Sequence, residues 1–474
     1  MTMKFLVALL IVAPSCSFAM NLQEYLNAVS SKHKTIQSLD VQKEAADLRK
    51  EAGDISLVPV LQANAFYSED KSPTNQWVSF GADESKSYGG TLGLSKSFSS
   101  GTNVALSAQA AEFQNPGLNP LLGDFQKFGT GSLGVSISQS LWKDFFGEAT
   151  RMRWATQDMS NAAEKGSYDL QKKSVMVQAE MAFWDYLYSV ENVSIARDSL
   201  ERSRRIETWT RRRVNDGISE KADLLQSQAL VASRQLALIA VEDDLASAKQ
   251  SLRDYLELEP SEPLPAMTGD ISKSRPLSSM VDGSRGRVVA LEAYLASLDA
   301  KAKELAARQV DENYKPDLVL SGSYQTNSKE NDLPAAAQKW GDTNRPTEKI
   351  GLNFTYMFDT DVKEAARNSS KKDALAAKLQ SERKALESES SWVELNRRYS
   401  ELSKRVEAAT QVVGLQESRA KAQADLFNKG RSITNDVVNA EEDAGTAKLN
   451  LSRLKSEQRK MEAQGRLYIA IEDK

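Results

Sequence analysis

Residues 131–160 read GSLGVSISQSLWKDFFGEATRMRWATQDMS, and they decide the fold because the periodicity changes within them. Apolar Leu133, Val135 and Ile137 alternate with serine and glycine, the period-two pattern of a strand with one apolar and one polar face. From Asp144 the alternation stops, and no proline occurs before Asp216. About 70 residues can therefore form one helix of roughly 110 Å at about 1.5 Å per residue, far longer than a globular core requires.

A glycine turn ends this helix, and the same unit occurs a second time in the chain. Residues 148–151, EATR, recur as residues 364–367, EAAR. The turn recurs at one constant spacing, with Asn215, Gly217, Ser219 and Asp223 matched by Asn428, Gly430, Ser432 and Asp436. Two similar copies predict a duplicated architecture.

The patterns predict a first repeat at 20–260, a linker at 261–284 and a second repeat at 285–474. For the first repeat we expect a helix, strands at 57–67, 90–98, 102–110 and 131–141, a long helix at 144–216, a tip at 215–223 and a return helix at 219–258. For the second we expect a helix, strands at 316–325 and 349–358, a long helix at 361–428, a tip at 428–436 and a return helix. The second copy lacks the hairpin at 90–110, and the sequence leaves open whether that hairpin joins the sheet or extends outside it.

Residues 1–19 have the pattern of a secretory leader. A short positive start precedes an apolar run of eight from Phe5 to Val12 and a small-x-small cleavage site ending at Ala19. This run is shorter than the roughly 20 residues of a spanning helix. Cys16, the only cysteine, would leave with the leader, although the sequence leaves open whether it is lipidated instead. A chain cut at Ala19 has no disulfide or thiolate chemistry.

Composition excludes several functional classes. The 61 basic and 65 acidic residues nearly balance, whereas a nucleic-acid surface would show a large basic excess. His33, the single histidine, lies in a polar helical segment. The chain has no phosphate-binding glycine loop, metal-ligand cluster or serine nucleophile motif, so we expect no enzyme activity, no metal and no cofactor.

The strands and loops favour a membrane barrel. Long and short loops alternate, each strand approaches the 9 to 11 residues that cross a bilayer when tilted, and aromatic residues lie near strand ends. The alternative is a soluble β-layer packed on helices. No other stretch reaches about 18 consecutive apolar residues, so we expect no transmembrane helix. Four or six strands cannot close a barrel, whose minimum is about eight, so a barrel requires strands from more than one chain.

Apolar residues at intervals of seven predict coiled-coil packing of the return helices. They are Leu224, Val231, Leu238, Leu245 and Leu252, and likewise Ala447, Leu454, Met461 and Tyr468.

With a leader, doubled strand and long-helix units, and two glycine tips followed by aspartate, the chain resembles the TolC-type outer-membrane efflux family. The resemblance rests on residues 133–141 running into 148–149, on 182–185 (AFWD), and on the tips at 217–226 and 430–440. It implies an α+β membrane protein that forms a homotrimer. One transmembrane β-barrel, with four to six strands per chain here, would continue into a long periplasmic α-helical coiled-coil barrel.

The resemblance also implies a location and a function. The protein would lie in the outer membrane of a Gram-negative bacterium, in contact with outer-membrane lipid, and extend into the periplasm. It would be the passive exit duct of a tripartite efflux or type I secretion system, with a periplasmic adaptor and an inner-membrane pump as partners. The sequence does not reveal the cargo. A non-conducting periplasmic coiled-coil scaffold is the alternative, and neither reading involves nucleic acid.

In this family, acidic residues after the second tip ring the closed periplasmic mouth. Asp436 matches that position, whereas Asn439 stands at the next acidic one, and Asp223 is the corresponding acid of the first repeat. A ring of carboxylates favours cations, although a first-turn acid can equally stabilise a helix N-terminus. We expect adaptor docking at the tip turns, formed by Asn215, Gly217, Ser219, Asn428, Gly430, Arg431 and Ser432.

An arginine cluster precedes the first tip and has two interpretations. It is either a solvated helix face or a docking surface for an adaptor hairpin. Its members are Arg202, Arg204, Arg205, Arg211, Arg212 and Arg213.

Overall fold

The computed structural model describes residues 19–283, 286–358 and 360–471. Residues 1–18 of the predicted leader, with Cys16, lie outside this range. The chain forms two compact units. One contains residues up to Lys43 together with 166–294 and 383 onward, and the other contains 44–165 and 295–382. Each unit therefore draws on both predicted repeats.

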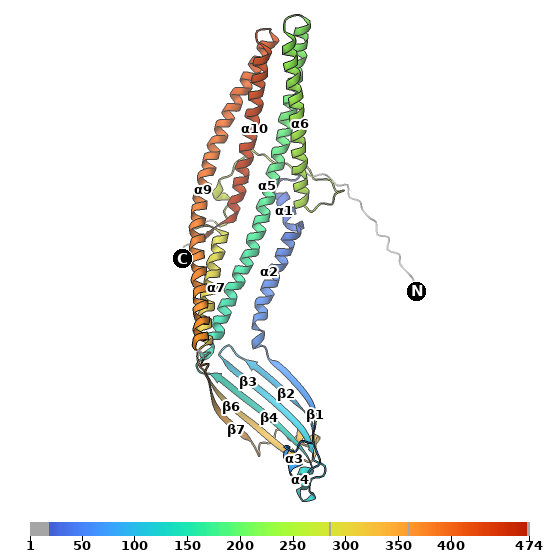
Figure 1. Cartoon of the computed structure of the whole chain (residues 1–474), viewed down its shortest axis with the longest axis vertical. Helices are drawn as coiled ribbons and strands as arrows, with labels where there is room; N and C mark the ends of the chain where they lie inside the picture. The colour runs from blue at the N-terminus through green and yellow to red at the C-terminus, as the bar shows by residue number, and fades with distance from the viewer. Residues whose placement is uncertain (1–18, 284–285, 359, 472–474) are drawn as a thin grey trace, which may run out of the picture. The chain divides into compact units, whose positions relative to one another are not determined.

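The second unit is built on one antiparallel sheet of six strands in the order β1-β2-β3-β4-β6-β7 (Figure 1). The strands are β1 (Val60–Asp70), β2 (Ser85–Ser97), β3 (Thr102–Gln114), β4 (Lys127–Ser140), β6 (Asp317–Glu330) and β7 (Thr347–Thr355). The hairpin of β2 and β3 lies inside the sheet, between β1 and β4. Within the single chain the hairpin is therefore part of the sheet, which has six strands.

Several strands extend beyond the predicted ranges. β2 begins at Ser85 instead of residue 90, and β3 ends at Gln114 instead of residue 110. The apolar alternation stops where the predictions stopped, but the backbone ladder continues, because Gln114 pairs with both Lys86 and Lys127. β7 ends at Thr355, short of the predicted residue 358, because its partner strand β6 begins at Asp317, opposite Thr355.

The sheet has one apolar and one polar face, because residues paired across a ladder lie on the same side. One cross-strand row is Ala63, Leu92, Ala108 and Leu133. The neighbouring row on the other face is Asn64, Thr91, Gln109, Ser132 and Asn327. The apolar face is largely uncovered, with Leu61 71% and Ile350 89% exposed.

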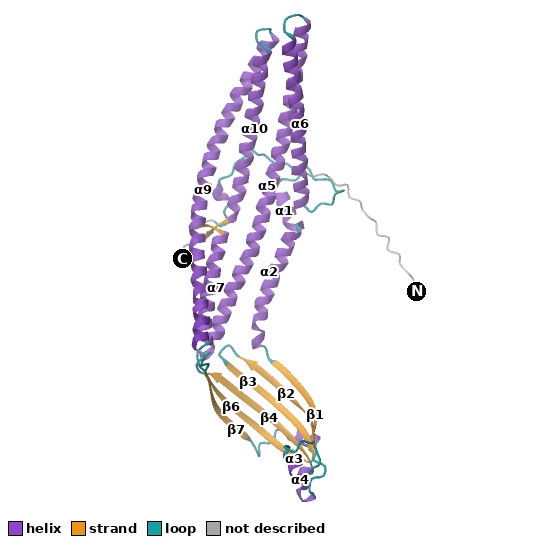
Figure 2. Cartoon of the chain, in the orientation of Figure 1, coloured by secondary structure: helices purple, strands orange, loops and turns teal. Residues whose placement is uncertain are grey.

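Helices dominate the first unit (Figure 2). The helices are α1 (Leu22–Lys32), α2 (Lys34–Ala52), α5 (Glu148–Asn215), α6 (Lys221–Tyr255), α7 (Leu291–Asn313), α9 (Thr360–Asn428) and α10 (Thr434–Gln464), of which α2, α5, α7 and α9 also contribute to the second unit. α5 contains 68 residues and α9 contains 69, so each glycine turn follows one uninterrupted long helix. The N-terminal segment forms two helices because His33 adopts an extended conformation between them.

Short elements connect these helices and strands. They are α3 (Gln76–Ser79), α4 (Gly123–Gln126), α8 (Leu333–Gln338), and the 3₁₀ turns η1 (Gly53–Leu57), η2 (Pro120–Leu122), η3 (Phe145–Gly147), η4 (Leu277–Ser279) and η5 (Gly465–Leu467). β5 (Arg287–Ala290) pairs with β8 (Tyr468–Ile471) in a two-stranded sheet that the sequence patterns did not predict. Tyr468 therefore lies in a strand, so the placement of this residue on the last helical stripe was wrong.

The buried core of the first unit lies where α1, α5 and α6 meet the linker. Tyr25, Phe183 and Leu252 are fully buried there, together with Met267 of the linker. The aromatic stretch at 182–185 thus supplies core packing: the Phe183 ring lies 5.5 Å from Tyr25 and 5.4 Å from Trp184.

Among the described residues, α6 is the one helix long and apolar enough to cross a membrane by length and composition. Only 11% of its most apolar window is buried. Leu225, Leu236 and Ile239 are more than half exposed, whereas the predicted heptad positions are partly or fully buried. The helix therefore packs along the heptad stripe and leaves a second apolar face uncovered in the single chain.

Candidate functional site

The two tips have the same backbone geometry. Gly217 has φ +70° and Gly430 has φ +72°, a left-handed conformation that favours glycine. In each tip the residue after the glycine bonds back across the last helical turn, the Ile218 N–H to the Arg213 carbonyl and the Arg431 N–H to the Leu426 carbonyl. Both helices thus end in the same glycine-dependent C-terminal motif, which satisfies their last carbonyl groups.

The three residues predicted to control the periplasmic mouth lie in the first turns after the tips. Asp436 and Asn439 are exposed on α10, three residues apart and hence on neighbouring positions of one helix face. Asp223 lies in the first turn of α6, where its Oδ2 atom accepts the Glu220 backbone N–H at 3.2 Å. Asp223 therefore helps to cap its helix, as expected for an acid in the first turn.

The predicted tip-turn residues differ in accessibility. Asn215, Gly217, Asn428, Gly430 and Arg431 are exposed, and Ser219 is partly buried. Ser432 is buried, and its hydroxyl donates to Gln423 Oε1 at 2.9 Å. The exposed residues offer a surface to a partner, whereas Ser432 shapes the turn.

Contacts between the two hairpins, α5–α6 and α9–α10, link the tips within one chain. The Arg213 guanidinium lies 4.6 Å from the centre of the Phe427 ring and donates to the Ser432 carbonyl at 3.2 Å. Gln226 Nε2 donates to Asn435 Oδ1 at 2.9 Å. We call these three contacts the tip latch.

A small apolar cluster supports the tip latch. Ile206 of α5, Leu230 of α6, Phe427 of α9 and Val437 of α10 are buried against one another. Because each residue comes from a different helix, the cluster holds both hairpins together by removing apolar surface from water.

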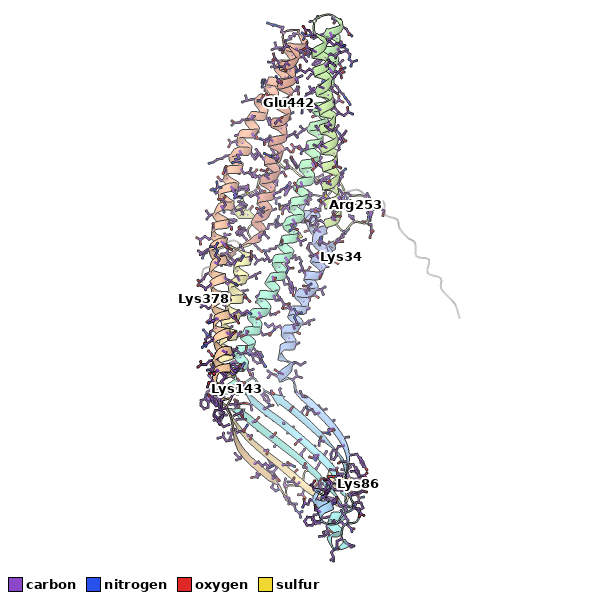
Figure 3. All side chains as sticks on the ribbon, in the orientation of Figure 1. Lys34, Lys86, Lys143, Arg253, Lys378 and Glu442 are labelled. Carbon is purple, nitrogen blue, oxygen red and sulfur yellow. The ribbon has the colours of Figure 1, made fainter. Side chains whose placement is uncertain are left out.

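A groove of about 440 Å³ lies beside this cluster, lined by residues of α5, α9 and α10. The ion pair of Arg202 with Glu441, 2.6 Å long, crosses between two of these helices and is largely shielded. Glu442, labelled in Figure 3, follows on α10 in the same acidic run.

The arginine cluster divides into two groups. Arg202 and Arg213 contact the second hairpin, as described above. Arg204, Arg205, Arg211 and Arg212 are exposed in the single chain. Their surroundings fit a solvated face, while Arg213 belongs to the tip latch, a role that the sequence pattern did not single out.

Comparisons with known proteins agree with this architecture. Residues 124–256 match the model of a family described as outer membrane efflux protein. Over 207 residues the chain is 24% identical to toxin and drug export protein A of Aggregatibacter actinomycetemcomitans, covering 42% of this chain and 43% of that protein. The chain thus aligns with less than half of that relative.

Solved channel structures share the fold along nearly the whole chain. The outer-membrane channel OprN superposes with a TM-score of 0.66 at 15% identity, covering 94% of this chain and 89% of OprN. VceC of Vibrio cholerae gives 0.66 at 14% identity, covering 93% of this chain and 94% of VceC. MtrE of Neisseria gonorrhoeae superposes with a TM-score of 0.63 at 16% identity, covering 94% of this chain and 88% of MtrE.

The family matched by residues 124–256 is one of efflux proteins, in agreement with the transport role, rather than an enzyme activity, that the sequence predicts. The same match agrees with the predicted location in the outer membrane. Residues 124–256 thus match the outer membrane efflux protein family, which the doubled helices and glycine tips also resemble, and the chain shares its fold with solved outer-membrane channels.

Proposed function

We propose that this protein is the trimeric exit duct of a tripartite efflux or type I secretion system, through which solutes pass passively from an inner-membrane pump to the cell exterior. The sheet carries this proposal. It has an uncovered apolar face, a polar face, and unpaired edges at β1 and β7. Unpaired edges are not tolerated in lipid, so β7 of one copy pairs with β1 of the next and the polar faces enclose a lumen.

Three copies would supply about 18 strands, a number at which barrels enclose a water-filled channel. The uncovered apolar face of α6 supports the same assembly. Leu225, Leu236 and Ile239 would be covered by the neighbouring subunit, completing a hollow coiled-coil barrel in the periplasm. The apolar sheet face would contact outer-membrane lipid.

The tips form the gate in this proposal. Asp436 supplies a ring of three carboxylates at the periplasmic mouth, with Asn439 beside it and Asp223 bracing the first tip. Such a ring favours cations. The tip latch holds the hairpins together, and a periplasmic adaptor that binds the exposed tip turns opens the mouth by releasing it.

Ion conductance of the detergent-purified protein in a planar bilayer tests the duct and the gate together. We expect discrete single-channel steps with a cation preference that weakens in Asp436→Ala, because the exposed carboxylate ring is lost. Asp223→Ala is the matched control, since it removes a helix-capping acid. If the cation preference of the single-channel steps is the same in Asp436→Ala as in the wild type, Asp436 does not form the selectivity ring. An inserted trimer without conductance would exclude the duct.

A further inference from the structure

Two loops at one end of the sheet contact its polar face through aromatic side chains. Residues 71–84, with α3, join β1 to β2, and residues 115–126, with η2 and α4, join β3 to β4. Both connect the strand ends opposite to those that lead into α5 and α9, so in the proposed duct they lie at the outer mouth.

An aromatic cluster anchors these loops to the sheet. Phe113 and Phe128 are ladder partners with stacked rings 5.1 Å apart. Phe125 stands edge-on to Phe128 at 6.0 Å, and Trp77 of the first loop stacks on Phe125 at 5.4 Å. Phe128 is four residues from Ser132 in the same strand, and alternation therefore puts the cluster on the polar face.

A lysine of the neighbouring strand completes the cluster. Lys329 pairs with Thr130, and so shares the polar face with Phe128. Its Nζ atom lies 3.6 Å from the centre of the Phe125 ring and 4.7 Å from that of Phe128. Within the part of the chain that the structure describes, no carboxylate pairs with Lys329, so its positive charge is held over the aromatic rings without neutralisation.

Hydrogen bonds hold the second of these loops, residues 115–126, in shape. Asn115 is fully buried, accepts from the Ser85 hydroxyl and donates to the Phe125 carbonyl, both at 2.8 Å. Gln126 donates to the Leu118 carbonyl at 2.8 Å. The aromatic cluster is therefore part of a preformed structure.

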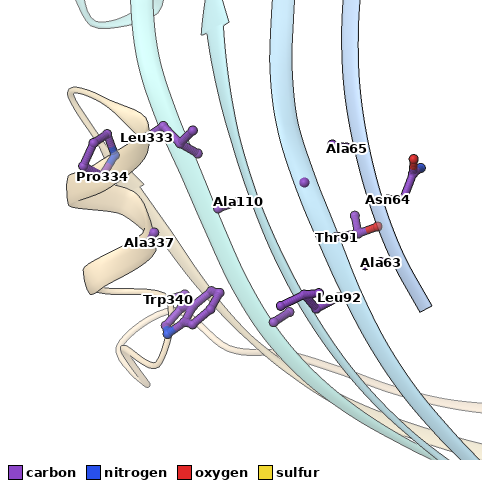
Figure 4. A pocket seen from close by; sticks show the side chains of 12 residues that line it. Ala63, Asn64, Ala65, Thr91, Leu92, Ala110, Leu333, Pro334, Ala337 and Trp340 are labelled. Atoms are coloured by element: carbon purple, nitrogen blue, oxygen red, sulfur yellow. The ribbon is translucent and has the colours of Figure 1, made fainter. Parts of the chain in front are cut away.

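The third long loop packs on the opposite face. Ser328, which pairs with Gly131 on the apolar side, donates to the Ala336 carbonyl of α8 at 2.9 Å. An apolar groove of about 590 Å³ separates this loop from β1, β2 and β3, with Trp340 on the loop side (Figure 4). Only the loops at 71–84 and 115–126 thus cover the polar face among the described connections.

We propose that these two loops form a constriction at the outer mouth of the duct, and that Lys329 makes this constriction favour anions. The proposal rests on the proposed function, since the polar face lines a lumen only when the sheet closes into a barrel. In a trimer the exposed ammonium groups of three Lys329 residues would face that lumen.

Charge replacement at a single cysteine tests the proposal, because the chain has no cysteine beyond Cys16. Lys329→Cys channels are recorded across a potassium chloride gradient before and after treatment with cationic or anionic methanethiosulfonate reagents. We expect the chloride-to-potassium permeability ratio to fall about twofold in the variant, to recover with the cationic reagent, and to fall further with the anionic one. Lys339→Cys, on the loop of the opposite face, should respond to neither reagent.

Whether the loops narrow the duct is tested separately, by removing the aromatic side chains that anchor them to the sheet. Trp77→Ala with Phe125→Ala should raise single-channel conductance, provided that the variant still runs as a trimer in mild detergent. If Lys329→Cys channels conduct but their chloride-to-potassium permeability ratio is unchanged by both reagents, the proposal is wrong. Inserted wild-type trimers that do not conduct would overturn the duct itself, and the constriction with it.

Discussion

At the scale of single residues, a buried ion pair constrains the first unit most strongly. Arg459 and Glu462 of α10 lie 2.7 Å apart with side chains 1% and 5% exposed. Burial lowers the pKa of Arg459 and raises the pKa of Glu462. Tyr399 donates to Glu462 at 2.9 Å, and burial together with this carboxylate raises the pKa of Tyr399 to about 12. The opposite charges of Arg459 and Glu462 compensate each other's burial, and the hydrogen bond from Tyr399 adds to the compensation of Glu462.

Glu462→Gln should destabilise the folded protein by about 3 to 5 kcal/mol, because it leaves the Arg459 charge buried and uncompensated. The melting temperature of the detergent-solubilised protein measures this loss. Glu457→Gln is the control, since its pairing with Arg453 is exposed and 3.7 Å long, and such a pair contributes at most about 1 kcal/mol. Equal melting temperatures for the two variants would contradict the expected role of burial.

Glu394 of α9 predicts a dependence of stability on acidity. Hydrogen bonds from Arg397 and Arg398 lower its pKa from the ordinary 4.5 to about 2. A carboxylate with a lowered folded-state pKa stabilises the fold above its ordinary pKa and loses that contribution as the pH falls toward the folded value. Between pH 4.5 and 2 the melting temperature should therefore fall less steeply in Glu394→Gln than in the wild type. If the melting temperatures of the two proteins fall in parallel with pH, the Glu394 carboxylate contributes nothing to the pH dependence of stability.

At the scale of elements, the tips combine a local motif with a long-range contact. The glycine turn of each tip is set by its own residues, because a positive φ favours glycine. The tip latch instead joins helices more than 200 residues apart in sequence, such as Arg213 to Ser432. We therefore expect the turns to persist when the latch is broken.

Arg213→Ala should open the periplasmic mouth more often, because it removes a cation–π contact of about 0.5 to 2 kcal/mol and a charged hydrogen bond. Higher open probability in bilayer recordings is the expected result. Arg212→Ala is the matched control, because Arg212 is exposed and forms no ion pair within the described residues. Equal open probabilities for the two variants would exclude Arg213 from the gate.

At the scale of the whole molecule, the hairpin of β2 and β3 determines how wide the proposed barrel is. It lies within the sheet of the single chain, so in the proposed barrel every copy would add two strands to the wall. Barrel diameter grows roughly in proportion to strand number. The hairpin therefore widens the exit without altering the helices.

Deleting residues 85–114 should narrow the barrel by about a third, from about 18 to about 12 strands. The remaining edges are compatible, because β1 and β4 run in opposite directions. Electron microscopy of the detergent-solubilised trimer measures the diameter directly. An unchanged diameter would mean that the hairpin lies outside the closed wall in the assembly.

The sequence by itself determined the features that depend on neighbouring residues. Alternation at Leu133, Val135 and Ile137 specified a strand, the proline-free run after Asp144 specified the long helix, and Gly217 specified its end. These are local preferences of backbone and side chain, and short-range periodicity records them.

Only the tertiary structure decided which distant segments meet. Insertion of β2 and β3 into the sheet, the pairing of β5 with β8, the tip latch, and the choice of face by each outer loop all depend on contacts between residues far apart in sequence. These contacts are hydrogen bonds between strand edges and contacts between aromatic rings. The periodic pattern of one segment does not indicate which distant segment it will contact. Lys329 illustrates the difference: alternation predicts its face of the strand, but only the folded loops supply the rings of Phe125 and Phe128.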